Sequence, residues 1–263
     1  MVRNLTKHMD ARTYKKIYSM LEPSNVKAIS RDFSVDEGVL SNILNQKLQR
    51  SDRALYYKVV SDGGSLLERW EKGESFVSLS KEMGFSTVLM ALILLKRRGM
   101  GRREIQKMLK CPKMVKDRRL SAELSEVVKN DFIFSPNAHL LQREKARMGE
   151  EFIRDWLLGK KIDFLTEKEI KERGGTKTPD FLLENPLKID GIGIRWIDSK
   201  GLFGDESEHR RFLKKQFLEY IELFGAGMVV YWYGFVDSVI EKERKVLVKD
   251  NTYFGIDNAL DIR

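Results

Sequence analysis

The sequence predicts an α/β protein, with an all-α N-terminal region followed by a domain built on a mixed sheet. Residues 1–134 carry apolar side chains at helical spacing and no strand-like run, whereas residues 135–263 combine helical stretches with short apolar runs typical of strands. A cluster of helix-breaking residues at 134–137 separates the two patterns. We therefore expect two domains, over residues 1–134 and 135–263.

The composition is that of a globular chain with a sizeable core. Its 263 residues are 42% hydrophobic and 33% charged. No apolar run reaches the roughly 20 residues that cross a bilayer, and the first residues lack the apolar segment of a secretory signal. We therefore expect a cytoplasmic protein that does not enter membranes. The single cysteine, Cys111, allows no internal disulfide, and three scattered histidines give no zinc cluster, so oxygen atoms must hold any metal.

The net charge of +9 comes entirely from the N-terminal region. Residues 1–134 contain 26 Lys and Arg against 16 Asp and Glu, while residues 135–263 contain 22 against 23. A basic excess on one part of a chain is typical of a protein that binds a polyanion. Nucleic acid, and DNA above all, is the expected partner, although a generally basic surface gives the same numbers.

Apolar spacing in the N-terminal region predicts helices joined by short turns. The first three expected helices include residues 17–21, 26–33 and 39–48. The pattern recurs as a helix over residues 76–83, a turn that contains Gly84, and a Ser-capped helix over residues 88–95. Such a helix-turn-helix unit can place its second helix in the major groove of DNA. Plain packing of two helices gives the same pattern, so both interpretations stay open.

A strongly basic run follows the second of these units. Eleven lysines and arginines lie between residues 96 and 119, opposed by two acids, Glu104 and Asp117. A solvated helix face normally mixes the two signs. The run therefore predicts contacts with phosphates. The candidate nucleic-acid-binding residues are Lys96, Arg97, Arg98, Arg102, Arg103 and Lys107.

The C-terminal domain is expected to follow the order helix, three strands, helix, strand (αβββαβ), which describes a mixed sheet covered by helices. The helices are expected near residues 139–158 and 206–224. The strand-like runs are residues 179–183, 187–189, 192–198, 228–236 and, in a shorter form, 246–248. Asp190-Gly191, between two of these runs, is a strong signal for a two-residue hairpin turn.

Asp198 and Lys200 stand out among the acid-x-lysine triplets of the chain. They end the apolar run that begins at Ile192, and alternation along a strand puts both on the face of Trp196. Burying an acid and a base there is costly unless they pair or hold a metal. Asp180 opens a neighbouring strand-like run and adds a second carboxylate. Two carboxylates at one strand end can hold Mg²⁺ together with water and a substrate phosphate.

These residue types suit the hydrolysis of a phosphodiester. Asp180, Asp198 and the Ser199 carbonyl would be metal ligands, and Lys200 would orient the attacking water or stabilise the developing charge. A third acid is expected from the helix that precedes the strands, where Glu151 is preferred and Glu150 stays open. A structural Asp–Lys ion pair explains the same spacing without any chemistry.

Three blocks of sequence, residues 176–181, 196–205 and 230–235, together resemble the TPD-domain family, named for its Thr-Pro-Asp, here Thr178-Pro179-Asp180. That family belongs to the PD-(D/E)XK nuclease superfamily, and its members also carry a helical first half, so the resemblance covers most of the chain. It implies a restriction-endonuclease-like fold for residues 135–263. It further implies that Pro179-Asp180 supplies the PD, Asp198-Ser199-Lys200 the (D/E)XK and Glu151 the helix acid. Eukaryotic relatives have Glu in place of Asp198, and the superfamily accepts both.

A second, weaker resemblance concerns residues 216–220. Gln216 and Tyr220 match the Gln-x-x-x-Tyr motif of RecB-like nucleases, which places a polar pair beside the substrate strand. By this resemblance Gln216 is a catalytic candidate. An ordinary amphipathic helix explains the spacing equally well, since residues four apart share one helix face.

The sequence therefore predicts a nuclease that hydrolyses phosphodiester bonds in DNA with Mg²⁺ or Mn²⁺ as its cofactor, and it leaves structure-specific cleavage open. The first alternative is a non-catalytic DNA-binding regulator or scaffold with a nuclease-like domain. Intact Asp180, Asp198 and Lys200 argue against that alternative, because a decayed site usually loses a ligand. The second alternative is an RNA-processing nuclease. A homodimer and a protein partner stay open as well.

Overall fold

The structure, a computed structural model, describes residues 9–240 and 245–255. The chain divides into two compact units. The sheet unit comprises Met1–Leu44 and Glu144–Arg263, and the helical unit comprises Asn45–Arg143. These compact units do not follow the predicted division at residue 134, because the first helices pack with the sheet. The division into a nucleic-acid-binding and a catalytic part is a separate, functional prediction.

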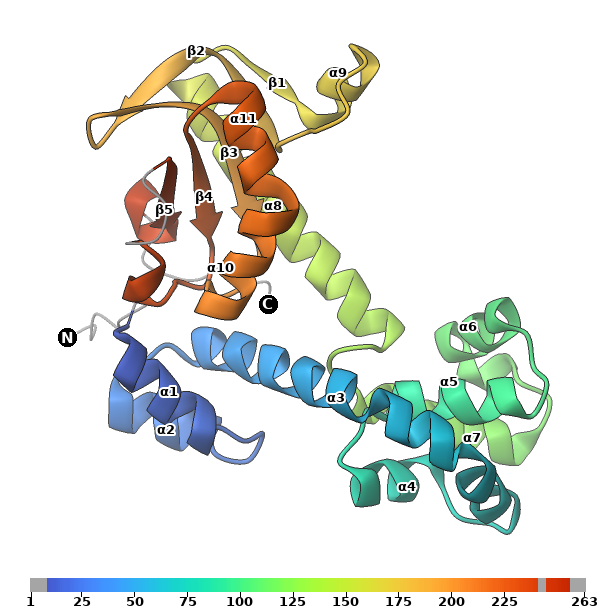
Figure 1. The fold of residues 1–263 in the computed structure, drawn as a ribbon. Helices are drawn as coiled ribbons and strands as arrows, with labels where there is room; N and C mark the ends of the chain where they lie inside the picture. The colour runs from blue at the N-terminus through green and yellow to red at the C-terminus, as the bar shows by residue number, and fades with distance from the viewer. Residues whose placement is uncertain (1–8, 241–244, 256–263) are drawn as a thin grey trace. The chain divides into compact units, whose positions relative to one another are not determined.

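The helical unit contains the predicted helices that include residues 39–48, 76–83 and 88–95, and further helices that were not predicted individually (Figure 1). They are α3 (Glu37–Glu71), which begins in the sheet unit, then α4 (Phe76–Met83), α5 (Thr87–Arg97), α6 (Arg102–Lys110), the 3-10 turn η1 (Pro112–Met114), α7 (Arg118–Asn130) and the start of α8 (Pro136–Gly159). Ser75 caps α4 and Ser86 caps α5 through hydrogen bonds accepted from backbone N–H groups. Gly84 ends α4 with a left-handed backbone, so the turn lies where it was predicted.

Helix α5 is the centre of the helical unit. Six of its eleven residues are buried, and it contacts α4, α6 and α7. Among the described residues no single helix is long and apolar enough to cross a membrane; α4 and α5 meet that test of length and composition only together, bent by 116°. The predicted second helix of the helix-turn-helix unit is thus a core helix of this unit.

Two short helices of the sheet unit precede α3. They are α1 (Ala11–Met20) and α2 (Val26–Phe33). Asp10 caps α1, and its carboxylate accepts hydrogen bonds from the N–H groups of Arg12 and Thr13. The Tyr14 hydroxyl donates to Asp205 at 2.7 Å, which connects α1 to the loop after the third strand.

The sheet has five strands in the order β1-β2-β3-β4-β5. They are β1 (Phe164–Thr166), β2 (Phe181–Ile189), β3 (Ile192–Lys200), β4 (Gly227–Tyr231) and β5 (Val246–Asp250). The first three are antiparallel, and β3, β4 and β5 are parallel, so the mixed sheet is confirmed. Asp190 and Gly191 both have positive φ and form the predicted hairpin turn between β2 and β3.

Three details of the strand prediction are wrong. The run predicted at residues 228–236 forms a strand, β4, only as far as Tyr231. The runs at residues 179–183 and 187–189 belong to the single strand β2, whose pairing with β3 shifts register between Leu182 and Leu187. Pro186 lies inside that shift and cannot donate a ladder hydrogen bond, which explains why the sequence pattern shows two runs. Strand β1 was not predicted, because its three half-buried residues give no clear alternation.

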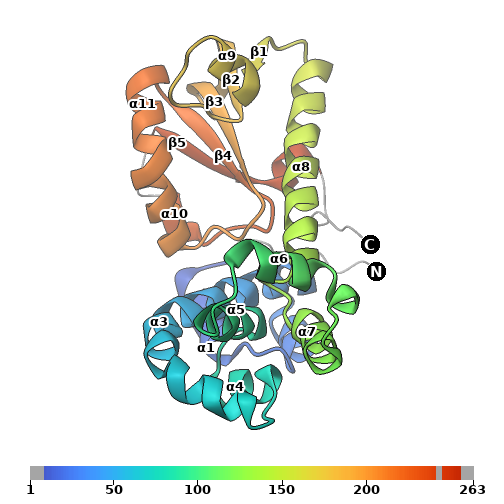
Figure 2. The ribbon, with the colours of Figure 1, turned by 90° about the vertical axis from the view of Figure 1, so that its right-hand side faces the viewer.

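Helices cover both faces of the sheet (Figure 2). One face carries α10 (Glu206–Phe212), a π-helical segment (Leu213–Phe217) and α11 (Leu218–Phe224), and the other carries α8. The remaining elements are α9 (Glu167–Glu172) and the 3-10 turns η3 (Asp237–Val239) and η4 (Asn251–Phe254). Trp196 of β3 stacks on Phe217 with 5.5 Å between ring centroids, and Gly227 leaves room for its indole. This packing fixes the face on which Asp198 and Lys200 lie.

Candidate active site

The end of β3 carries a buried acid and base. Trp196, Asp198 and Lys200 alternate along the strand and share the face covered by α10 and α11. Asp198 is 2% exposed and forms a close ion pair with Lys200. The Lys200 ammonium also lies 4.7 Å from the centroid of the Phe212 ring. Two charges are therefore held in a poorly hydrated site, where electrostatic interactions are stronger than in water.

Asp180 lies beside this pair at the start of β2. The next residue, Phe181, pairs with Ile197 of β3. The Oδ2 atom of Asp180 accepts a 2.7 Å hydrogen bond from the backbone N–H of Ser199. Burial raises the pKa of Asp180 well above its ordinary value, and the charge of Asp198 raises it further. Burial also raises the pKa of Asp198, while the Lys200 ammonium opposes that effect. Asp198 is thus close enough to Asp180 for its charge to act on the ionisation of Asp180.

The two glutamates of α8 lie in different surroundings. Glu151 accepts a 2.5 Å hydrogen bond from Arg147 on its own helix, and Glu150 is the more exposed of the two. The pKa of Glu150 is raised, first by partial desolvation and then by the charges of Glu167 and Asp198. Glu150 in turn raises the pKa of Asp180. Of the two glutamates, Glu150 is therefore the one that interacts electrostatically with Asp180 and Asp198.

Gly149 explains how α8 comes so close to β3. A Cβ atom at this position would lie 2.3 Å from the indole Nε1 of Trp232 and 3.0 Å from the hydroxyl of Ser199. Without a side chain, the helix backbone rests directly on these two groups. The next residue along the helix is Glu150, so this contact positions that carboxylate near the end of the strand.

The predicted Gln216 and Tyr220 lie in and just after the π-helical segment. The buried Oε1 of Gln216 has no hydrogen-bond partner in the part of the chain that the structure describes. The Tyr220 hydroxyl donates to the carbonyl of Thr178 at 3.1 Å, and its pKa is raised by burial and by the charges of Asp198 and Asp180. Segments of π-helix inside longer helices are frequent at functional sites. Tyr220 is thus connected to the Thr-Pro-Asp segment.

Sequence reasoning missed one acid, Glu167 at the start of α9. Its Oε1 accepts a hydrogen bond from the Thr178 hydroxyl at 3.3 Å, and its charge raises the pKa of both Glu150 and Asp198. No spacing in the sequence connects Glu167 to the strands. Only the antiparallel pairing of β1 with β2 brings the start of α9 back to Thr178.

The donor set fits a hard divalent cation. Within residues 9–240 and 245–255 no three ligating side chains are close enough together to hold a metal ion by themselves. Asp180 and Asp198 offer two carboxylates, however, and Mg²⁺ is typically held by one or two carboxylates while water and substrate phosphates fill its remaining positions. The Ser199 side chain turns to the opposite face, where its hydroxyl accepts a 2.8 Å hydrogen bond from Trp232, so only its carbonyl is a candidate ligand.

The predicted nucleic-acid-binding residues separate into two groups. Arg97 donates to the carbonyl of Val60 at 3.4 Å, and Arg98 lies 5.2 Å from the centroid of the Trp70 ring and 4.0 Å from Glu71. These two arginines are engaged within the helical unit. The other four are exposed and make no ion pair with any described residue; they are Lys96, Arg102, Arg103 and Lys107.

The fold and the site define a class of protein: an α/β protein with a carboxylate and a lysine at the end of one strand of a mixed sheet and a second carboxylate at the start of the neighbouring strand. The sequence pattern of the family described as "Protein of unknown function TPD sequence-motif" matches residues 116–252, which include this site. The chain belongs to the TPD sequence-motif family.

Curated relatives named "CDAN1-interacting nuclease 1" match two thirds of the chain. The protein of Mus musculus is 35% identical over 181 residues, which cover 66% of this chain and 64% of the relative. The protein of Homo sapiens is 34% identical with the same coverage, and that of Danio rerio is 31% identical over 66% of this chain and 61% of the relative. The chain thus spans somewhat less than two thirds of the length of these relatives. No solved structure matches it.

Proposed function

We propose that this chain is a divalent-cation-dependent nuclease with a restriction-endonuclease-like catalytic domain. The observation that carries the proposal is the buried group of Asp180, Asp198 and Lys200, joined through the backbone N–H of Ser199 at the end of β3. The relatives' printed name, which contains the word nuclease, points to the same activity.

Each residue has a role that follows from its surroundings. Asp180 and Asp198 would hold the cation, which when bound supplies a Lewis acid at the scissile phosphate and lowers the pKa of a coordinated water. Lys200 would stabilise the charge that develops on the phosphate oxygens, because it is held in place by Asp198 and Phe212 before substrate arrives. Gln216 would offer its unpartnered amide oxygen to a water or substrate group.

We place Glu150, rather than the preferred Glu151, in the role of the helix acid. The charge of Glu150 raises the pKa of Asp180, and the charge of Asp198 raises the pKa of Glu150. Glu151 instead forms an ion pair with Arg147. Adjacent residues point about 100° apart around a helix, so the two glutamates cannot exchange roles without turning α8.

Helix α6 is the part of the helical unit best suited to contact phosphates. Its apolar residues Ile105 and Leu109 are buried, while Arg102, Arg103 and Lys107 face solvent. Buried α5 leaves only its basic C-terminal end free for such contacts. In this arrangement α6, and not α5, would lie against nucleic acid, with DNA preferred over RNA as in the sequence-based prediction.

A second function rests on the relatives' names, which describe proteins that interact with CDAN1. A protein partner for this chain is thus a parallel proposal, compatible with nuclease activity.

A cleavage assay tests the proposal. The chain is incubated with labelled linear, flapped and branched DNA and RNA in Mg²⁺, Mn²⁺ or EDTA, beside Asp180→Asn and Asp198→Asn. We expect cleavage that needs the cation and is lost in both variants, while affinity for nucleic acid stays within a few-fold because the basic surface is unchanged. Cleavage at the wild-type rate by the double variant would remove these residues from the site.

A further inference from the structure

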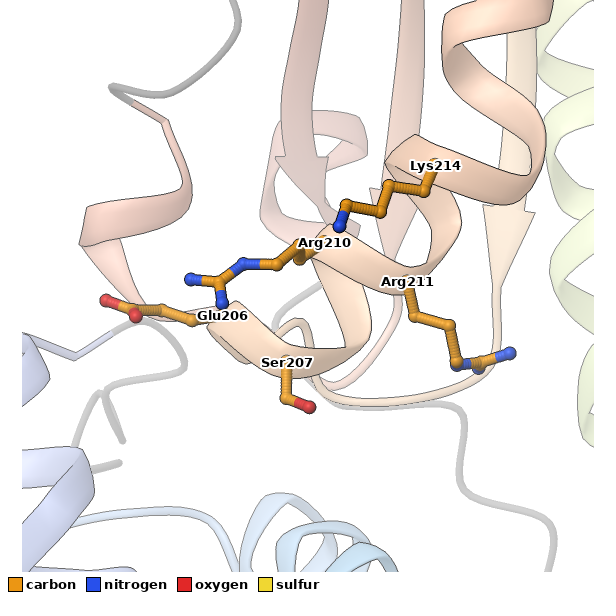
Figure 3. A pocket seen from close by; sticks show the side chains of 5 residues that line it. All are labelled: Glu206, Ser207, Arg210, Arg211 and Lys214. Atoms are coloured by element: carbon orange, nitrogen blue, oxygen red, sulfur yellow. The ribbon is translucent and has the colours of Figure 1, made fainter.

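The outer side of α10 and of the π-helical segment carries a hollow of about 370 Å³ that the nuclease mechanism does not use (Figure 3). It is lined by Glu206, Ser207, Arg210, Arg211 and Lys214. Three of these five side chains are cationic, and the hydroxyl of Ser207 adds a neutral donor. Figure 3 shows Lys214 directed toward Arg210, while Arg211 extends to the other side of the helix.

The pairing of these side chains leaves positive charge available. Arg211 is bound to Glu208 through its Nε at 2.9 Å. Arg210 and Lys214 are exposed and have no ion pair with any residue that the structure describes. Glu206, the single acid in the lining, accepts a 2.6 Å hydrogen bond from the Ser238 hydroxyl. The lining therefore carries a net positive charge, with two cations that have no ion pair within residues 9–240 and 245–255, which suits an anion.

The hollow is adjacent to the candidate active site. The guanidinium of Arg211 lies 4.2 Å from the centroid of the Phe212 ring, and the ammonium of Lys200 lies 4.7 Å from the same centroid. The Phe212 ring thus contacts both the cation of the active site and the first cation of the hollow. Along one strand of a nucleic acid, phosphates recur about every 3.4 Å of helix axis. A strand that binds with its scissile phosphate at Lys200 and continues past Phe212 would bring a neighbouring phosphate to the hollow.

We propose that this hollow binds a phosphate group of the nucleic-acid strand next to the one that is cleaved. Arg210 and Lys214 contact the phosphate oxygens, Ser207 donates a hydrogen bond to them, and Arg211 is held by Glu208 at the rim. The inference rests on the proposed nuclease function for its substrate class. The same chemistry would receive either an internal phosphodiester or a terminal phosphate, so the test separates these two sources.

Binding is measured without divalent cation, by fluorescence anisotropy of labelled oligonucleotides over a range of salt, so that it does not depend on cleavage. The test variant is Arg210→Gln/Lys214→Gln. The control is Lys188→Gln/Lys215→Gln, which removes two exposed lysines outside the hollow and the same total charge. We expect a loss of affinity of at least tenfold and a salt slope flatter by about one for the test variant, and a change below threefold for the control. Thermal melting confirms that both variants fold.

A walk of single neutral methylphosphonates along the oligonucleotide, together with a 5′-hydroxyl end in place of a 5′-phosphate, identifies the group. A methylphosphonate at one position should weaken binding by the wild type but not by Arg210→Gln/Lys214→Gln, because that variant already lacks the cations that bind this phosphate. That position is the terminus for a terminal phosphate and an inner linkage for a phosphodiester. Equal losses in test variant and control, or losses that add at every position, overturn the proposal. A chain that binds in this manner yet never cleaves would overturn the nuclease function and leave the phosphate site standing.

Discussion

The indole N–H of Trp232 donates a 2.8 Å hydrogen bond to the hydroxyl of Ser199, and the pair forms the surface on which Gly149 of α8 rests. Ser199 also gives its backbone N–H to Asp180. One residue thus connects the helix that carries Glu150 with the carboxylate that opens β2. A substitution at this contact is expected to change both the stability of the protein and the positions of the candidate metal ligands.

Gly149→Ala should lower the free energy of unfolding by about 1–3 kcal/mol, because the new methyl group overlaps the Trp232 indole and packed interiors tolerate added atoms poorly. It should also weaken Mn²⁺ binding, since α8 must move and takes Glu150 with it. Gly159→Ala is the control, because a Cβ there meets nothing within 4 Å. Denaturant unfolding and calorimetric titration of Mn²⁺ check both expectations, and equal stability of the two variants would contradict the first.

Glu150→Gln should reduce Mn²⁺ affinity and cleavage by at least tenfold, whereas Glu151→Gln should leave both within about twofold. The two substitutions remove the same charge from neighbouring residues of one helix, so each controls for the other. The difference is expected because only Glu150 acts electrostatically on Asp180, while Glu151 is bonded to Arg147. The reverse order would return the role of helix acid to Glu151.

Cation binding should release protons. The pKa values of Asp180 and Asp198 are raised by burial, so in the free protein protons compete with the cation up to a higher pH than for ordinary aspartates. Mn²⁺ affinity should therefore fall as pH falls. Calorimetry at pH 6 in two buffers of different ionisation enthalpy measures the protons released, and Asp198→Asn should release fewer. Affinity that does not vary with pH would show that both carboxylates are already ionised.

Asp52 should make the stability of the helical unit depend on pH. Burial raises the pKa of Asp52 to about 6, the Asp131 charge adds to this, and the Ser86 N–H opposes it. The folded chain thus holds a proton that the unfolded chain has released, so stability falls as pH rises from about 4 to about 6. Asn cannot ionise and can still accept from Ser86.

We therefore expect the free energy of unfolding of Asp52→Asn to exceed that of wild type by roughly 1–3 kcal/mol at pH 7.5 and to differ little from it at pH 4. Asp62→Asn, an exposed site on the same helix, is the control. Urea unfolding at both pH values decides the matter, and a gain of equal size at both would assign the effect to something other than ionisation.

Reversing Arg102, Arg103 and Lys107 to Glu should weaken binding of every nucleic-acid sequence to a similar extent. It should also flatten the plot of log affinity against log salt by about one for each phosphate that the chain no longer neutralises. A triple reversal of Arg53, Lys58 and Lys72, exposed cations elsewhere in the helical unit, changes the net charge equally and should have a smaller effect. If both reversals weaken binding alike, α6 is not a specific contact surface.

Local pattern was enough to predict most elements. The helix over residues 76–83, its Gly84 turn and the helix that follows were predicted because caps and apolar spacing agree. The Asp190-Gly191 hairpin was predicted because both of its residues accept a positive φ. Alternation along β3 also put Asp198 and Lys200 on one face, as the ion pair confirms.

Local sequence pattern could not predict how deeply each element is buried or which distant residues it contacts. The spacing over residues 88–95 fits a recognition helix and a core helix equally, and only tertiary packing buries them. Arg97 and Arg98 form the same sequence pattern as Arg102 and Arg103, yet the side chains of the first two contact Val60 and Trp70 of α3. Glu150 and Glu151 differ by one residue, and the choice between them depends on where a helix touches a sheet.

The π-helical segment at Leu213–Phe217 sets the direction of the residues that follow it. A π turn holds one residue more than an α turn. If the same residues formed a regular α-helix throughout, every residue after the segment would lie about 100° further around the helix axis, because each residue of an α-helix adds that angle. Tyr220 would then face away from the carbonyl of Thr178, although no residue of the site had been altered. The π turn is therefore as much a part of this site as the identity of Tyr220.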